Sequence, residues 1–267
     1  MRMPVLFIGH GSPMIALEDS PLTDKLKQVG QKIQDIDGPV RGILSISAHW
    51  YKNANYVQSA AQPEQIYDMY GFPEALYQVE YPAKGDLAIT EAVQAVLGDE
   101  VTLNDRWGVD HGSWTVLVHM FPAADIPVVQ LSVNSQLGPR AAYDLGRKLA
   151  PLRDRGLLIM GSGNIVHNLR QVRGDIDGGT PQTERFAGFI TEAVEAGDIE
   201  ALLNYESHPD AAYAVPTPDH FRPFIMALGA ADGDPARAFN RENRMGALAM
   251  DSYLFTESAD QAGRYDL

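Results

Sequence analysis

Short apolar runs rich in β-branched residues alternate along this chain with longer segments of helical periodicity. The runs have the length and composition of buried strands and cover residues 4–8, 42–47, 126–131 and 157–160. The helical segments cover residues 22–33, 87–97, 112–120, 141–149, 183–196 and 221–228. Strands that alternate with helices usually pair in one sheet, with the helices on its faces. The sequence therefore predicts an α/β fold with a central, mostly parallel or mixed sheet flanked by helices. The apolar tail at 246–255 is compatible with one more strand, although its periodicity does not decide this.

The chain carries no repeat, low-complexity tract or long linker that would divide it. A length of 267 residues suits one large α/β domain, and we expect a single catalytic domain over residues 1–267. Cysteine is absent, which excludes disulfides, thiolate nucleophiles and Cys-ligated metals. Any metal site must therefore be built from His, Asp and Glu.

The net charge of −14 opposes binding to nucleic acid or to anionic lipid, so we expect neither as a partner. The apolar run at the N-terminus is shorter than a signal peptide or a membrane helix requires. The expected compartment is the cytoplasm. The sequence does not specify an oligomeric state.

Three of the seven histidines follow predicted strands closely, namely His10, His49 and His167. In α/β sheets, ligands gather outside the carboxyl ends of the strands, and neighbouring strands bring distant residues together there. A single histidine in such a place is more often structural, but three favour a shared site. Imidazole suits both metal ligation and proton transfer near neutral pH.

Two further histidines lie at predicted helix starts. His111 has Asp110 and Ser113 beside it as capping candidates, and the helix N-terminus favours its neutral form. It is equally compatible with a buried structural role. His220 lies where a Pro-containing loop enters an apolar helix. We leave His119 and His208 out of the site, because the first lies among apolar neighbours on a helix and the second is expected to be exposed.

Five motifs that contain these histidines occur in a familiar order: GHGSPM at 9–14, SAHW at 47–50, GVDHGSW at 108–114, GSGNIVHNL at 161–169 and TPDH at 217–220. Together they resemble the class III extradiol ring-cleavage dioxygenases, in particular the branch similar to 4,5-DOPA extradiol dioxygenase. The resemblance spans residues 4 to about 250. It implies the class III extradiol dioxygenase fold in a single domain, and insertion of O₂ into a catechol-type ring, DOPA-like or related, to give a muconic semialdehyde.

The resemblance also implies one non-haem divalent metal, Fe(II) for activity, with Zn(II) possible as the bound ion. By motif, His10 and His49 match the two metal-binding histidines and His220 matches the third ligand. His167 matches the catalytic acid–base, and whether it also ligates the metal is left open. His111 matches a histidine that orients a ligand or hydrogen-bonds the substrate. The implied partners are a small aromatic diol and O₂.

One departure from the wider class leaves alternatives open. Other class III members have Glu as third ligand, whereas this chain offers His220 beside Asp219. An all-imidazole set is also typical of hydrolytic zinc, so a zinc-dependent hydrolase is one alternative, and a non-enzymatic binding protein on the same fold is another. Asp219 could instead orient a metal-binding side chain without binding the metal itself.

The substrate is less defined. The physiological catechol and the position of ring cleavage are not specified by the sequence. Arg222 and Arg170 are candidates for binding a substrate carboxylate. The segment YDMYGFP at 67–73 resembles a loop of the DOPA-dioxygenase branch, although its contacts cannot be derived from the sequence.

Overall fold

The strands of the central sheet follow the apolar runs of the sequence. A computed structural model describes residues 2–267, and within this range one eight-stranded sheet has the order β4-β3-β5-β2-β6-β1-β10-β7. Its strands are β1 (Val5–Gly9), β2 (Gly42–Lys52), β3 (Tyr56–Gln58), β4 (Thr102–Asn104), β5 (Val128–Asn134), β6 (Leu157–Gly163), β7 (Ala236–Phe239) and β10 (Ser252–Phe255). A separate antiparallel pair is formed by β8 (Asn243–Arg244) and β9 (Leu248–Ala249).

The four central strands β5, β2, β6 and β1 are parallel. Every residue of β1, β5 and β6 is buried, as expected for strands covered on both faces. Antiparallel pairing enters toward both edges, where β3 joins β5, and β10 joins β1 and β7. The predicted α/β class with a mixed sheet is therefore confirmed.

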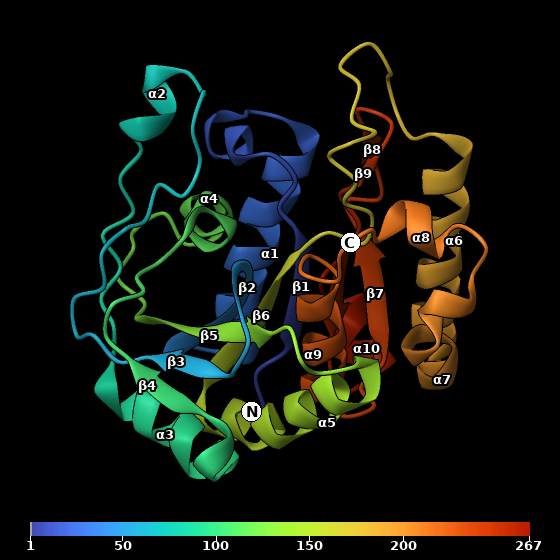
Figure 1. Ribbon diagram of the computed structural model, residues 1–267. Coiled ribbons are helices and arrows are strands. Elements are labelled where there is room, and N and C mark those ends of the chain that lie inside the picture. Colours follow the sequence, from blue (N-terminus) through green and yellow to red (C-terminus); the bar gives the residue numbers. More distant parts are fainter. Residues whose placement is uncertain (1) are drawn as a thin grey trace.

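The helices of the chain are α1 (Pro21–Asp37), α2 (Glu74–Tyr77), α3 (Leu87–Leu97), α4 (His111–Met120), α5 (Pro139–Leu149), α6 (Pro181–Ala196), α7 (Ile199–Leu203), α8 (Ala211–Ala214), α9 (Arg222–Ala231) and α10 (Ala259–Gly263). Helices α1 and α4 pack on one face of the sheet, and α3, α5 and α9 cover the other face (Figure 1). Figure 1 shows α2 and the β8–β9 pair at the same end of the molecule. No helix between residues 2 and 267 has the length and hydrophobicity needed to cross a bilayer.

Several boundaries differ from the sequence prediction. Strand β2 continues to Lys52, past the expected end at 47, because a register shift between Ile46 and Tyr51 lets the strand continue beside β5. The tail at 246–255 forms two short strands, of which β10 is antiparallel to β1. The short strands β3, β4 and β7 were not predicted, because three or four residues carry too little periodicity to identify.

Candidate metal centre

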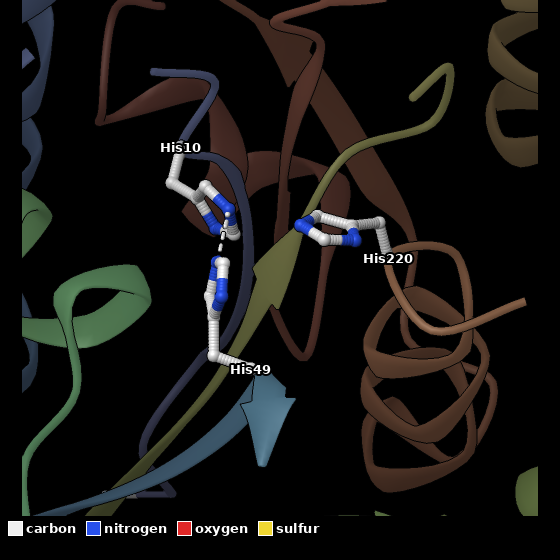
Figure 2. A group of neighbouring side chains, drawn as sticks. All are labelled: His10, His49 and His220. Atoms are coloured by element: carbon white, nitrogen blue, oxygen red, sulfur yellow. Dashed lines mark hydrogen bonds between the residues drawn. The ribbon is translucent and has the colours of Figure 1, made fainter. Parts of the chain in front are cut away.

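Three histidines from distant parts of the chain meet at the carboxyl ends of the central strands. His10 follows β1 directly, His49 lies in the outer part of β2, and His220 lies in the turn before α9. Their candidate ligand atoms all lie within 4.8 Å of one another, and Nε2 of His10 is 3.2 Å from Nε2 of His49. Figure 2 shows the three rings turned toward a common point.

Two glycines allow this close approach. Gly11 has a φ of +59°, a conformation that L side chains rarely adopt, and it redirects the chain immediately after His10. A Cβ on Gly163, at the end of β6, would lie 2.0 Å from the carbonyl oxygen of His220. Any larger residue there would push the His220 turn away from the sheet.

Each ring has a polar partner at its Nδ1, which favours a lone pair on Nε2. The Ser162 hydroxyl donates to the carbonyl of Gly112, so it accepts from Nδ1–H of His10 at 2.9 Å. The Asp219 carboxylate accepts from Nδ1–H of His220 at 2.5 Å. Asp68 Oδ2 lies 3.3 Å from Nδ1 of His49, which favours the same tautomer in the third ring.

The three imidazoles fit a divalent metal ion. Nε2 of His220 is buried and has no hydrogen-bond partner among the described residues, and Nε2 of His10 and Nε2 of His49 face one another within hydrogen-bond distance, an approach that one shared cation would also produce. Two nitrogens bound to one tetrahedral ion at about 2.1 Å would be about 3.4 Å apart, close to the 3.2 Å observed. The donor set is therefore complementary to a metal of the imidazole-binding type.

Burial keeps these rings uncharged near neutral pH. Burial and the neighbouring imidazoles hold the pKa values of His10 and His220 well below the ordinary range. Burial lowers the pKa of His49 to about 3 and the pKa of His167 to about 4. Neutral imidazole is the form that binds a metal or accepts a proton.

These shifts predict how the stability of the metal-free protein depends on pH. The pKa of His49 is lower in the folded than in the unfolded state, so the unfolded chain binds more protons than the folded protein below about pH 6.5. The free energy of unfolding therefore falls as the pH falls from about 6.5 toward 4. A His49→Gln variant has no imidazole at this position and therefore lacks this pH-dependent loss of stability. The unfolding free energy of the wild type should therefore fall relative to that of the variant by about 1.4 kcal/mol per pH unit over this range. Urea unfolding of both metal-free proteins at pH 7.5, 6, 5 and 4.5 measures the difference, and a constant difference would contradict it.

His167 and His111 each lie against a different one of the three rings. The imidazole of His167 stacks on that of His220, with ring centroids 3.5 Å apart and planes 7° apart. His111, the first residue of α4, lies 3.8 Å from His49 between ring centroids. All five motif histidines are thus gathered in one place.

A single carboxylate, Asp68, holds two of these rings. Its Oδ1 accepts from both the backbone N–H and Nδ1–H of His111, each at 2.9 Å, while its Oδ2 faces His49. Neither predicted capping side chain bonds to the first turn of α4, and Asp110 instead accepts from Ser47 and Trp107. The sequence indicated the loop at 67–73 but not this contact, because Asp68 lies 43 positions before His111.

The two remaining histidines lie outside the cluster. Nε2 of His119 is hydrogen-bonded to the carbonyl of Ile15 at 2.7 Å. The prediction that His208 is exposed is wrong, because its side chain is 16% exposed and stacks on Phe189 with centroids 4.8 Å apart. Its Nδ1 accepts from the backbone N–H of Asp210, so both rings have structural contacts of their own.

A cavity of about 280 Å³ opens over the cluster. Its polar lining includes His49, His111, His167 and His220, and no Lys, Arg, Asp or Glu is among the described residues that line it. The remaining walls are largely apolar and come from Pro13, Met69, Phe72, Leu169, Val172, Met245 and Leu248. A flat apolar ligand with a polar edge toward the histidines suits this cavity.

Comparison with known proteins agrees with this geometry. Residues 4–253 match the family described as the catalytic LigB subunit of aromatic ring-opening dioxygenase. The chain is 40% identical over 259 residues to a 4,5-DOPA dioxygenase extradiol of Escherichia coli K12, covering 93% of each protein. It is 37% identical to the protein of that name from Beta vulgaris, covering 94% of this chain and 96% of the relative.

A crystal structure of an uncharacterized Escherichia coli K12 protein superposes with a TM-score of 0.80 at 35% identity, covering 96% of this chain and all of the other. The resemblance inferred from the five motifs is thereby confirmed, and the non-enzymatic alternative is set aside. The chain belongs to the LigB family of aromatic ring-opening dioxygenases and is an extradiol ring-cleavage enzyme.

Proposed function

We propose that His10, His49 and His220 hold one divalent metal ion, Fe(II) for turnover, and that the protein opens the ring of a small aromatic diol. The convergence of three uncharged imidazoles beside an apolar cavity carries this proposal. When bound there, ferrous iron would hold the diol and supply electron density to O₂. One catalytic domain, residues 1–267, would contain the whole site.

His167 is proposed as the acid–base residue. Burial lowers its pKa to about 4, so its imidazole is free to accept a proton from a ring hydroxyl near neutral pH and to return that proton later. It has no side-chain hydrogen bond to another described residue that would compete for its nitrogens. His111 donates Nδ1–H to Asp68, which leaves its Nε2 to accept a hydrogen bond from the substrate.

The relatives named 4,5-DOPA dioxygenase extradiol support a DOPA-like diol as substrate. The ring bond beside the diol would break, both atoms of O₂ would enter the product, and the product would be a muconic semialdehyde. The apolar cavity walls would hold the ring while the histidines contact the hydroxyl edge.

An oxygen electrode and a spectrophotometer used together test this function. The protein, loaded anaerobically with Fe(II), is expected to consume one O₂ per diol and form a yellow semialdehyde with at least one of DOPA, protocatechuate, caffeate and 4-methylcatechol. The Zn(II)-loaded protein should do neither, because zinc has no accessible redox change. Absence of uptake with all four diols, together with ester or amide hydrolysis by the zinc form, would establish the hydrolase alternative instead.

Asp68 is expected to strengthen metal binding by orienting the ring of His49, without binding the metal itself. In an Asp68→Asn variant the carboxylate charge that fixes His49 and His111 is lost, and we expect metal affinity to fall about 10–100-fold. Competition with a chromophoric chelator measures this. The exposed Asp105→Asn change is the control with the same charge difference and should bind metal as the wild type does. Equal affinities for all three proteins would contradict the role.

A further inference from the structure

Arg222 is a buried arginine with two guanidinium nitrogens that lack a partner among the described residues. Its residue is 5% exposed, yet its Nε and Nη1 atoms have no hydrogen-bond partner among residues 2–267. Burying a charge that nothing compensates is strongly unfavourable. A guanidinium kept in this state points to an anion that comes from outside the chain.

Another arginine shows how this protein satisfies a buried guanidinium for structural purposes. Arg153 is fully buried, and its Nε donates to the carbonyl of Met3 at 2.7 Å. Its Nη1 donates to the carbonyls of Ala230 and Ala231, and Nη2 pairs with Asp234. Every nitrogen of Arg153 is bonded, which separates it from Arg222.

Arg222 is close along the chain to His220, one of the three candidate metal ligands. It begins α9, two residues after His220. Tyr51 lies in β2 two residues after His49, a backbone distance of about 7 Å in a strand. Helix α9 packs on β2, and Tyr51 packs against the hydrophobic cluster that contains Phe224 of α9, so the phenol lies on the side of the sheet that α9 covers. The charge of Arg222 also opposes the rise that burial causes in the pKa of the Tyr51 phenol.

Two other arginines are less suitable for binding a carboxylate. Arg170 is exposed to solvent. Arg244 lies at the neighbouring cavity of about 780 Å³, but its Nη1 is already bonded to both carboxylate oxygens of Glu18 at 2.8 and 2.9 Å, and its Nε is bonded to Glu242. Of these three arginines, Arg222 alone is both buried and uncompensated.

We propose that Arg222 and Tyr51 form a carboxylate-binding subsite beside the metal centre. The planar fork of a guanidinium matches the two oxygens of a carboxylate, and the phenol adds one hydrogen bond. Arg222 and Tyr51 are not among the residues that line the apolar cavity, so the carboxylate belongs either to a diol side chain that reaches past the cavity wall or to a separate small acid. This inference rests on the proposed function only for the position of the diol.

Binding to the Zn(II)-loaded protein tests the subsite without requiring turnover. Calorimetric titrations use 3,4-dihydroxyphenylacetate, its uncharged counterpart 4-methylcatechol, and phenylacetate, which lacks the diol. The variants are Arg222→Gln, Arg222→Lys and Tyr51→Phe, and Arg170→Gln is the control with the same loss of charge.

If the substrate supplies the carboxylate, the wild type should bind 3,4-dihydroxyphenylacetate about 10–100-fold more tightly than 4-methylcatechol. This ratio should fall to about one in Arg222→Gln, should fall in part in Arg222→Lys and Tyr51→Phe, and should be unchanged in Arg170→Gln. If a separate acid supplies it, phenylacetate should bind alongside saturating 4-methylcatechol, and only in proteins that retain Arg222.

Two results would overturn the subsite. One is a wild type that neither prefers the carboxylated diol nor binds phenylacetate. The other is a preference that Arg170→Gln weakens as much as Arg222→Gln does. If Arg222→Gln fails to fold, Arg222→Lys and Tyr51→Phe decide between the same outcomes. Tight binding of both diols without O₂ uptake by the Fe(II) protein would count against the proposed reaction but not against the subsite.

Discussion

A His49→Ala variant is expected to lose its metal and to show no measurable turnover. His49 provides one of three converging imidazoles, and its Nε2 is the partner that faces His10. Removing an outer partner of a ligand typically costs 10–100-fold in metal affinity, and removing the ligand itself should cost more. Elemental analysis after dialysis, together with O₂ uptake in the presence of DOPA, measures both effects.

His208→Ala is the matched control for this experiment. It removes an imidazole of similar burial that lies against Phe186 and Phe189, away from the cluster, so metal content and turnover should persist. Metal content in His49→Ala equal to that of the wild type would reject the proposed ligand set. If His10→Ala and His220→Ala also kept the metal content of the wild type, the proposal of a metal centre at these histidines would be rejected.

Replacing His167 by Ala should separate catalysis from metal binding. This variant is expected to retain most of its metal but to lose about 10²–10⁴-fold in kcat, because it lacks the group proposed to move a proton while the three principal ligands remain. Steady-state O₂ uptake at saturating diol gives kcat, and metal analysis of the same sample gives the occupancy.

Metal loss in His167→Ala as great as in His49→Ala would make His167 a fourth ligand instead. The stacking of its ring on His220 and its place in a second cluster with Asp219 and His220 make that comparison informative. Full activity would exclude both roles. His119→Ala, which alters a half-buried ring bonded to Ile15, should leave both quantities unchanged.

The parts of the molecule that could be predicted are those that depend on local pattern. Apolar runs and helical spacing identified the four parallel strands and the six longer helices, with ends that differ by a few residues. The order of strands and helices also implied that residues after β1 and in β2 would meet at one edge of the sheet. The structure does place His10 and His49 together there, and His220 joins them through the turn before α9.

Features that depend on pairing between distant segments could not be predicted. Asp68 lies in an irregular loop, and nothing in its neighbours indicates that it bonds to His111 and faces His49. The sequence does not distinguish Arg153 from Arg222, yet every nitrogen of Arg153 is bonded, whereas two nitrogens of Arg222 have no partner among residues 2–267. The burial of His208 was also not predictable, because the aromatic side chains that cover it come from the distant helix α6.

The wide spacing of the three candidate ligands also affects the order in which the site is completed during synthesis. The residues of β1, β2, β5 and β6 have all been added by residue 163, so the parallel core of the sheet can begin to form while the chain is still growing. His220 is added 210 residues after His10, an interval of roughly 10–40 s at ordinary translation rates. Until then a nascent chain offers an ion only two of the three imidazoles. The parallel core of the sheet can therefore begin to form well before all three candidate ligands are present.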